Sequence, residues 1–195
     1  MEIILSTIVL LIFIFGILEF KIHNKYLSNI PIRIHVNGSR GKSSVVRLIA
    51  AGLREGGFNT FGKTTGTSPR IIDNQGKDKY IHRLRSASIG EQISLIRYFS
   101  KLNPDALVIE CMAVNPQYQW ISEQKIVKST IGVLTNVRPD HLDEMGVSMD
   151  QITKSMANTI PFNGIMVSSE DKKIKILDDI CKTRNTQFHL SDINL

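Results

Sequence analysis

The chain contains the run Ile34-His35-Val36-Asn37-Gly38-Ser39-Arg40-Gly41-Lys42-Ser43-Ser44, and the prediction of its architecture starts there. A short β-rich segment, residues 32–36, leads into the turn. A helical segment follows it, in which apolar residues recur on one face, at Val45, Leu48, Ile49 and Leu53. A glycine turn between a strand and a helix is a setting in which backbone N–H groups cradle phosphates. The run therefore predicts a phosphate-binding loop.

The residues of this turn are candidate nucleotide-binding residues: Gly38, Ser39, Arg40, Gly41, Lys42, Ser43 and Ser44. Lys42 is expected to reach the β- and γ-phosphates of ATP, and the Ser43 hydroxyl is expected to bind Mg²⁺. The spacing departs from the Walker A motif, which places four residues between its glycines. Gly38 and Gly41 have only Ser39 and Arg40 between them. The alternative interpretation is a glycine-rich turn with a solvated lysine.

Strand-like and helix-like segments alternate along the rest of the chain. The apolar runs 106–109 and 130–137 are typical of strands that are buried on both faces. Shorter strand-like runs occupy residues 59–63, 164–168 and 186–190. This rhythm predicts an α/β fold of the P-loop type, with a mostly parallel sheet and flanking helices.

Local turn chemistry predicts where several elements begin. Capping-box spacing occurs at Ser88-Ile89-Gly90-Glu91 and at Ser148-Met149-Asp150-Gln151. Asn115-Pro116 has the residues of a helix N-cap and first helical position, and a helix is expected from there to about Val127. Residues 70–85 contain turn residues and predict a surface hairpin or an ordered loop.

Two groups of polar residues follow predicted strands directly. Glu110 ends one apolar run, and Asp140-His141-Leu142-Asp143 follows another. Parallel strands bring their carboxyl ends to one edge of the sheet, so these residues are expected beside the phosphate-binding loop. Glu110 is a candidate metal ligand or general base, and His141 is a candidate metal or phosphate ligand. The alternative for Glu110 is a helix-capping or ion-paired glutamate at the start of a loop.

The N-terminus predicts a membrane anchor. Ile3 to Leu18 is an uncharged apolar run of about 24 Å in helical form, which is slightly short of the ~30 Å hydrocarbon core. Basic residues follow the run, and this places the bulk of the chain in the cytoplasm. The predicted organisation is a single-pass transmembrane anchor at residues 1–20, a linker at 21–30 and an ATP-binding domain at 31–195. A buried or interfacial helix is the alternative.

Composition narrows the expected partners. The 195 residues include 24 Lys and Arg against 18 Asp and Glu, giving a formal net charge of +6. This balance suits nucleotides, polyanions or an acidic membrane surface. No compact Lys/Arg cluster interleaves with aromatic residues, so nucleic acid is not an expected partner. Cys111 and Cys181 lack the spacing of metal ligands and are expected to be reduced thiols.

Several of these blocks together resemble a known family. The stretch 38–44, the strand-end Glu110 and the stretch 136–143 resemble the central-domain signature of the Mur ligases. A closer resemblance, to the membrane-associated ligase subunits of poly-γ-glutamate synthases, covers nearly the whole chain. It is carried by the apolar N-terminus and by Gly62-Lys63-Thr64-Thr65-Gly66-Thr67, Ile89-Gly90-Glu91-Gln92, Glu110-Cys111-Met112-Ala113-Val114-Asn115-Pro116 and Thr159-Ile160-Pro161-Phe162-Asn163-Gly164.

The resemblance implies an ATP-dependent amide ligase that adds glutamate to glutamate or to a poly-γ-glutamate chain through an acyl phosphate. It implies that Lys42 contacts the phosphates, that Ser43 and Glu110 hold Mg²⁺, and that His141 holds a second metal ion. It also implies that Thr64, Thr65, Gly66 and Thr67 lie beside the phosphates or the acyl group. Other membrane subunits of a synthase complex are the implied partners.

Members of this family are expected to continue well beyond residue 195 and to use the later segments to close the site. ATP binding is therefore a safer expectation than turnover. The alternative function is a membrane-tethered P-loop ATP-binding or regulatory subunit, or an inactive fragment, without ligase activity.

Overall fold

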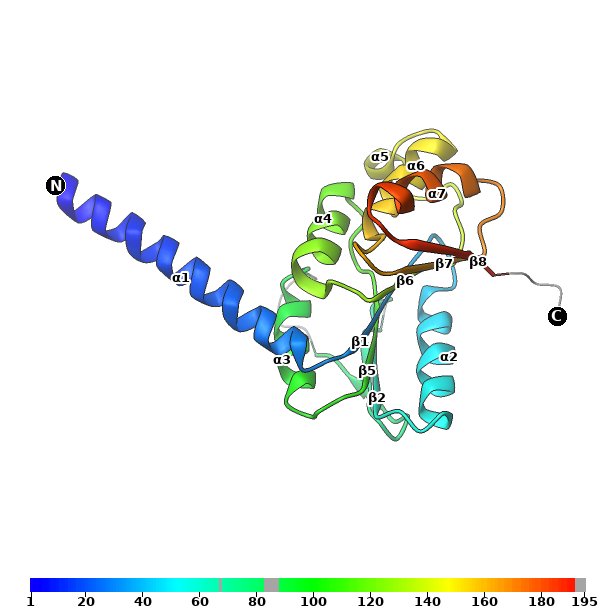
Figure 1. The fold of residues 1–195 in the computed structure, drawn as a ribbon, viewed down its shortest axis with the longest axis horizontal. Coiled ribbons are helices and arrows are strands. Elements are labelled where there is room, and N and C mark those ends of the chain that lie inside the picture. The colour runs from blue at the N-terminus through cyan, green and yellow to red at the C-terminus, as the bar shows by residue number, and fades with distance from the viewer. Residues whose placement is uncertain (67, 83–87, 192–195) are drawn as a thin grey trace.

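A computed structural model describes residues 1–66, 68–82 and 88–191, and it has the predicted α/β architecture (Figure 1). The strands are β1 (Ile32–Asn37), β2 (Thr60–Thr64), β3 (Arg70–Ile72), β4 (Asp78–Tyr80), β5 (Ala106–Glu110), β6 (Ile131–Leu134), β7 (Ile165–Ser168) and β8 (Gln187–Leu190). The α-helices are α1 (Glu2–Ser28), α2 (Lys42–Glu55), α3 (Glu91–Ser100), α4 (Pro116–Ile121), α5 (Leu142–Met145), α6 (Met149–Met156) and α7 (Ile174–Thr183). A π-helical segment, Ser122–Val127, continues α4, and a 3₁₀ turn, Ala157–Thr159, continues α6.

All eight strands form one sheet in the order β4-β3-β2-β5-β1-β6-β7-β8. The strands β2, β5, β1, β6, β7 and β8 are parallel to one another, and β3 and β4 add an antiparallel hairpin at one edge. For residues 70–85 the sequence predicts a surface hairpin or an ordered loop, and the structure has the hairpin; residues 83–85 lie outside the described residues. Val36 in β1 pairs with Glu110 in β5 and with Val133 in β6. This register brings the carboxyl ends of the central strands to one level.

Helices cover the two faces of the sheet unequally. On one face α2 packs against β1, β5 and β2, and Val46 and Ala50 are fully buried there (Figure 1). On the other face lie the α4 and π-helical layer and, over β6 to β8, a core that includes Met156, Met166 and Leu177. The difference leaves the α2 side of β6 and β7 without a covering helix among the described residues.

Helix α1 projects away from the sheet as a single rod (Figure 1). It is long and apolar enough to span a membrane, and none of its most apolar window is buried against the domain. The polar residues 21–30 predict a linker, and this is wrong for most of that range because α1 continues to Ser28. The reason is tertiary packing. Leu27 is buried among Phe99 and Ile126, and His23 Nε2 lies 2.7 Å from the Ile126 carbonyl oxygen.

Two of the three predicted helix caps are confirmed, and the third is wrong. Asn115 caps α4 by accepting a hydrogen bond from the Gln117 N–H, as predicted. Ser148 and Gln151 form the predicted capping box of α6. The capping box predicted at Ser88 and Glu91 is absent: α3 begins at Glu91 without a side-chain cap. Glu91 instead lies 3.2 Å from the buried ammonium group of Lys63, and pairing this buried charge takes the side chain away from the helix end.

Candidate functional site

The turn between β1 and α2 is held by the loop that follows β6. Gly38 has φ +136°, and a Cβ on this residue would lie 2.1 Å from Thr135 Oγ1 and 3.1 Å from the Asn136 backbone nitrogen. Only glycine permits this approach together with this backbone angle. The turn needs a glycine at position 38 because a neighbouring strand end fills the space of a side chain.

Hydrogen bonds connect the same two loops. The Arg40 N–H donates to Asn136 Oδ1 at 3.1 Å, and Asn136 Nδ2 donates back to the Arg40 carbonyl at 2.9 Å. The Ser39 hydroxyl accepts from the Arg138 N–H at 2.8 Å and is 2.9 Å from the Arg138 carbonyl oxygen. These bonds fix the backbone of the candidate phosphate-binding loop in place before any ligand arrives.

Lys42 is the first residue of α2, and its side chain folds back to contact the backbone of the preceding turn. Its Nζ donates to the Gly38 carbonyl at 2.6 Å and lies 3.5 Å from the Ser39 carbonyl oxygen. Gly41 precedes it with φ +82°, a left-handed conformation that suits glycine. The ammonium group is therefore held at the turn by the turn's backbone carbonyl groups.

Glu110 joins three parts of the site. Its Oε2 accepts from the Ser43 hydroxyl at 2.7 Å and from the Thr65 N–H at 2.8 Å. Glu110 is 3% exposed, and these two donors offset part of the cost of burying its carboxylate. One carboxylate thus connects β5 with the phosphate-binding loop and with the loop after β2.

The loop after β2 lies against the start of α2. Thr64 is buried at the end of β2, and Thr65 is held by Glu110. Gly66 is near Ser43, since a Cβ on Gly66 would lie 3.8 Å from the Ser43 hydroxyl oxygen. Thr67, the remaining predicted residue of this loop, lies outside the described residues.

His141 lies at the same edge of the sheet but is held less tightly. It precedes the short helix α5 with φ +45°, and its side chain is 51% exposed. Its Nε2 lies 3.8 Å from Asp140 Oδ1, so a carboxylate is near the ring. Asn115, which caps α4, donates to Glu144 of α5 at 2.8 Å and thereby ties this segment to the domain. Asp143 is exposed.

A cavity of about 190 Å³ contains most of the predicted site residues. It is lined by the phosphate-binding turn, by Thr65 and Gly66, by the segment 110–114, and by Asp140 and His141. Gly38, Ser39 and Lys42 contribute from the turn. Arg40 and Gly41 face a neighbouring groove instead, and Ser44 is exposed on the first turn of α2. The structure thus brings Lys42, Glu110 and His141 around one cavity.

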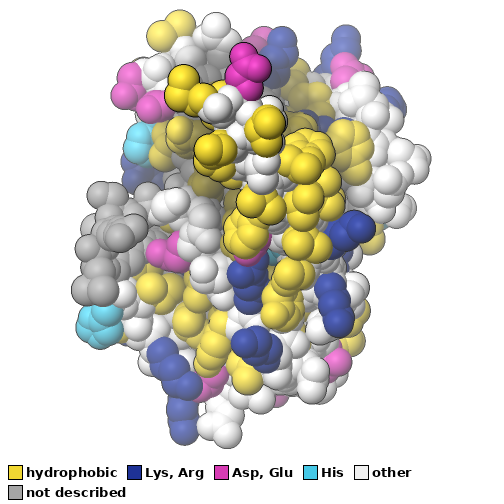
Figure 2. All heavy atoms as spheres, turned by 90° about the vertical axis from the view of Figure 1, so that its left-hand side faces the viewer, with side chains coloured by type: hydrophobic (Ala, Val, Ile, Leu, Met, Phe, Trp, Pro, Cys, Tyr) yellow, Lys and Arg dark blue, Asp and Glu magenta, His cyan; other side chains and the backbone are white. Residues whose placement is uncertain are grey.

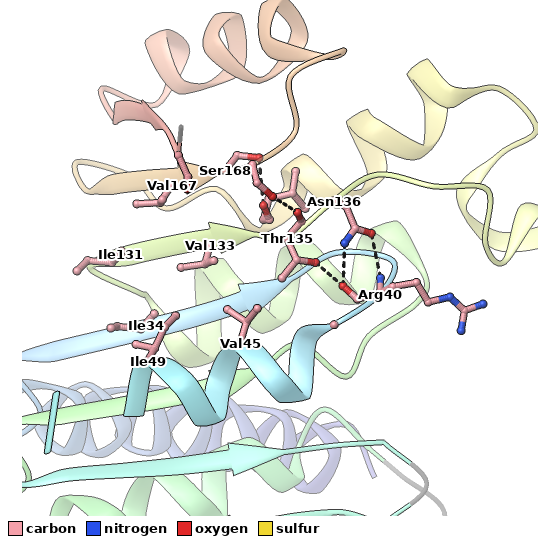
Figure 3. A pocket seen from close by; sticks show the side chains of 14 residues that line it. Ile34, Arg40, Val45, Ile49, Ile131, Val133, Thr135, Asn136, Val167 and Ser168 are labelled. Carbon is pink, nitrogen blue, oxygen red and sulfur yellow. Dashed lines mark hydrogen bonds between the residues drawn. The ribbon is translucent and has the colours of Figure 1, made fainter. Parts of the chain in front are cut away.

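The neighbouring groove is larger and mostly apolar. It has a volume of about 530 Å³ and runs between α2 and the strands β6 and β7 (Figure 3). Ile34, Val45 and Ile49 lie on one side, while Ile131, Val133 and Val167 lie on the other (Figure 3). Thr135, Asn136 and Arg40 close its upper end, next to the phosphate-binding turn. The groove occupies the part of the sheet that α2 does not cover.

The donor set around Glu110 fits a magnesium ion bound together with a nucleotide. Mg²⁺ prefers hard oxygen ligands, keeps several waters and uses only one or two protein carboxylates beside substrate phosphates. Ser43 and Glu110 supply a hydroxyl and a carboxylate with oxygens 2.7 Å apart. Among the described residues no three His, Cys, Asp or Glu side chains form a metal cluster, so a site of dedicated protein ligands is not indicated there.

Some residues that shape this region were not identified from the sequence. Asn136 and Thr135 hold the phosphate-binding turn through contacts that are nearly 100 residues apart in the chain. His35 looked unremarkable in the β1 run, yet its Nδ1 lies 2.7 Å from Glu123 Oε2 and both side chains are fully buried. A histidine between two apolar residues of a strand was the available signal, but the sequence spacing does not indicate its partner.

Comparison with known protein families identifies the family of this chain. Residues 36–193 match the Mur ligase middle domain family, which is most of the chain. The chain belongs to that family. The matched range begins just before the phosphate-binding turn and includes every candidate site residue described above.

The chain is also similar to two curated proteins. It is 40% identical over 183 residues to the capsule biosynthesis protein CapB of Bacillus anthracis, which covers 92% of this chain and 39% of that protein. It is 39% identical over 183 residues to the PGA synthase CapB of Bacillus subtilis (strain 168), covering 93% of this chain and 47% of that protein. The chain therefore spans less than half the length of the relatives it matches.

Among solved structures, the Escherichia coli FolC in complex with ADP superposes with a TM-score of 0.67. The sequence identity is 15%, and the match covers 89% of this chain and 46% of FolC. At this identity the likeness concerns the fold. It confirms the predicted mostly parallel sheet with flanking helices as the Mur ligase architecture.

Proposed function

We propose that this chain forms the nucleotide-binding part of an ATP-dependent amide ligase that joins glutamate to glutamate or to a poly-γ-glutamate chain. The observation that carries the proposal is that Lys42 and Glu110 line one cavity at the carboxyl ends of the central strands, where Glu110 accepts a hydrogen bond from the Ser43 hydroxyl. Family membership and the 40% identity to a capsule biosynthesis protein support the reaction class and the glutamate substrate.

The phosphates of ATP bind at the turn 38–41 and the start of α2. The first N–H groups of a helix have no intrahelical acceptors, and together with the helix dipole they favour anions. Lys42 exchanges its contact with the Gly38 carbonyl for the β- and γ-phosphates. That exchange is favourable because a charged donor gains charged acceptors in place of a neutral carbonyl.

Ser43 and Glu110 would hold Mg²⁺ beside these phosphates, with His141 as the proposed ligand of a second metal ion. The metal would neutralise charge on the transferring phosphoryl group. Glu110 then releases the Ser43 hydroxyl and keeps the Thr65 N–H, which holds the loop after β2 against the phosphates. The Thr65 loop is in this way coupled to nucleotide binding.

The reaction proceeds in two steps. A γ-carboxylate oxygen of glutamate attacks the γ-phosphorus of ATP, and the bond to the bridging oxygen breaks to release ADP and leave an acyl phosphate. The amine of the next glutamate then attacks the acyl carbon, loses a proton and displaces inorganic phosphate. Lys42 offsets negative charge that develops during the first step.

The N-terminal helix is the proposed membrane anchor. We infer that the apolar part of α1 spans the cell membrane once and that residues after it lie in the cytoplasm, since Lys21 and Lys25 follow the apolar run. The growing acidic chain and other membrane subunits of a synthase complex are the proposed partners. The net charge of +6 suits an acidic product.

Nucleotide binding and phosphate release by the full chain in lipid nanodiscs test this function. Lys42→Ala should weaken ATP binding by about 10- to 100-fold, the loss expected for a charge-assisted hydrogen bond. Glu110→Gln keeps the size of the side chain and should weaken only the Mg²⁺-dependent part of binding. Lys154→Ala, which removes an exposed lysine on α6, is the matched control and should bind ATP normally.

Glutamate-dependent phosphate release or a γ-linked product supports the ligase. ATP binding without glutamate-dependent release supports the alternative, a nucleotide-binding or regulatory subunit without turnover. ATP affinity that is unchanged in a folded Lys42→Ala variant would overturn the assignment of the turn itself.

A further inference from the structure

The C-terminal part of helix α1 is attached to the rest of the domain by several side-chain contacts. Glu19 pairs with Arg97 of α3, and His23 contacts the Ile126 carbonyl in the π-helical segment. Lys128 Nζ donates to Asn24 Oδ1 at 2.8 Å. These contacts, together with buried Leu27, fix the direction of α1 relative to the sheet. A membrane that holds α1 therefore also sets which face of the domain it meets.

The distance between the apolar run and the domain is short. Ser28 lies ten positions after Leu18, which is about 15 Å of helix. The polar headgroup region adds about 5–8 Å to each side of the hydrocarbon core, and the Debye length is ~8 Å at physiological salt. Side chains that contact Glu19, Phe20 and Asn24 accordingly lie within reach of the headgroups.

Basic and aromatic side chains of α1 and of the segment 120–128, which contacts α1, are here called the α1-collar: Lys21, Lys25, Trp120, Lys125 and Lys128. Lys128 lies over the Phe20 ring of α1 at 4.7 Å, and Lys125, almost one helical turn earlier, lies over the Trp120 ring at 5.2 Å. Figure 2 shows this side of the molecule, with Lys and Arg side chains gathered around the apolar helix.

Two positive charges of the α1-collar, those of Lys125 and Lys128, have neutral partners. Lys125 and Lys128 contact aromatic rings and an amide, while the nearby acid Glu19 is taken by Arg97. Partial burial and the positive charges of Lys125 and Arg33 lower the pKa of Lys128. The lysines thus repel one another on the isolated domain, and an anionic surface would relieve this repulsion. Trp is also a side chain that membrane interfaces favour.

We propose that the α1-collar docks on the anionic lipid headgroups of the bilayer in which α1 is anchored, so that the domain has one fixed orientation on the membrane. The inference rests on the proposed membrane anchoring.

Trp120 reports this contact directly because it is the only tryptophan in the chain. The full chain is reconstituted into vesicles that contain either phosphatidylglycerol or only phosphatidylcholine, with and without headgroup-labelled quencher lipid. Insertion is measured in parallel by flotation of the vesicles after an alkaline wash. Expressing quenching relative to the same variant in unlabelled vesicles removes changes in intrinsic emission.

In anionic vesicles Trp120 should be quenched, and quenching should fall in neutral vesicles or in high salt. The double variant Lys125→Gln, Lys128→Gln should lower the ratio of docked to undocked protein by about tenfold or more. Lys154→Gln with Lys175→Gln removes the same charge from exposed positions on α6 and α7 and should leave quenching unchanged.

Two results would overturn the proposal in distinguishable ways. If the full chain does not float with washed vesicles, the membrane anchor itself is wrong and docking falls with it. If the chain inserts but Trp120 is unquenched, or is quenched equally in neutral and anionic vesicles, anchoring stands and lipid docking is wrong.

Discussion

At the scale of single residues, the site depends on close contacts made by Gly38 and Glu110 that a different side chain would disturb. Gly38 touches the Thr135 side chain and the Asn136 backbone, and Glu110 holds two donors from different elements. Each of these residues acts as a junction between strand ends. Gly38 can carry no side chain because Thr135 and Asn136 fill the space, and Glu110 is required as the acceptor for Ser43 and Thr65.

Gly38→Ala should displace the phosphate-binding turn. The new Cβ meets Thr135 Oγ1, and the backbone angle of +136° is unfavourable for alanine, so we expect a loss of roughly 1–3 kcal/mol in the free energy of unfolding together with weaker ATP binding. Gly52→Ala is the control. Gly52 lies within α2 with no atom within 4 Å of an added Cβ, and alanine there should stabilise by up to about 1 kcal/mol. Chemical unfolding in detergent micelles and ATP titration measure both. Equal effects of the two variants would contradict the geometry.

The buried pair of His35 and Glu123 should make stability depend on pH. Burial alone lowers the pKa of His35, but the nearby Cys111 sulfur and the Glu123 carboxylate raise it to about 10, above its usual 6.5. Between about pH 6.5 and pH 10 the folded chain holds one more proton, on His35, than the unfolded chain. The contribution of the pair is therefore complete below about pH 6.5 and is lost as the pH rises towards 10.

The free energy of unfolding should accordingly fall between pH 7 and 9 by up to about 1.4 kcal/mol per unit. Glu123→Gln removes the charge that holds the proton and should flatten this dependence, while it lowers stability at pH 7. Unfolding curves of both proteins across the range measure the effect. Stability that stays nearly constant over the same range would show that His35 is neutral in the folded chain, because neither state would then bind a proton there.

At the scale of elements, caps and buried polar groups decide where helices begin and how they lie. Helix α4 turns into a π-helix at Ser122, and the two segments present polar side chains to the sheet. Gln119 accepts from Asn37 Nδ2 at 2.8 Å, and Ser122 donates to Gln92 at 2.6 Å. This buried polar layer connects the residue before Gly38 with the helices behind the sheet, because each group needs a partner once water is excluded.

Ser148→Ala tests the contribution of a single cap. The Ser148 hydroxyl accepts from the Gln151 N–H, and the Gln151 side chain returns to the Ser148 N–H, so the loss of the hydroxyl should cost about 1 kcal/mol. Ser94→Ala, at an exposed position on α3, has no capping role and should be neutral or slightly stabilising. Thermal unfolding of the two variants gives the comparison. A loss as large at Ser94 as at Ser148 would remove the cap as the cause.

At the scale of the whole molecule, α1 has two roles along its length. Its first part is exposed and apolar, whereas its last turns pack against α3 and the π-helical segment. The boundary lies near Glu19, where the ion pair with Arg97 begins the attachment. One continuous helix therefore serves as the proposed anchor and as a structural part of the domain.

Two truncations separate these roles. Removal of residues 1–18 should release a folded, soluble domain, because the packed turns with His23 and Leu27 remain. Removal of residues 1–28 also deletes Leu27, whose burial contributes about 1.5–3 kcal/mol, and the domain should unfold at a lower temperature. Fractionation after lysis and thermal unfolding check both. Identical melting temperatures would mean that the last turns of α1 do not support the domain.

Periodicity and local turn chemistry were sufficient to predict the α/β class, the strand-turn-helix unit at 32–55, most strands and helices, and the caps at Asn115 and Ser148. They were also sufficient to place Glu110 and the 140–143 segment at one sheet edge, because parallel strands align their carboxyl ends. These features follow from short-range geometry, which a sequence displays directly.

Tertiary structure alone decided the extent of α1, the missing cap at Ser88, and the partners of Lys63, His35 and Asn136. Each of these involves a contact between residues far apart in the chain, such as His35 with Glu123 or Arg40 with Asn136. Local preferences differ by a fraction of a kcal/mol per residue, whereas an unpaired buried charge costs several. The long-range contact therefore prevails over the local preference wherever the two conflict.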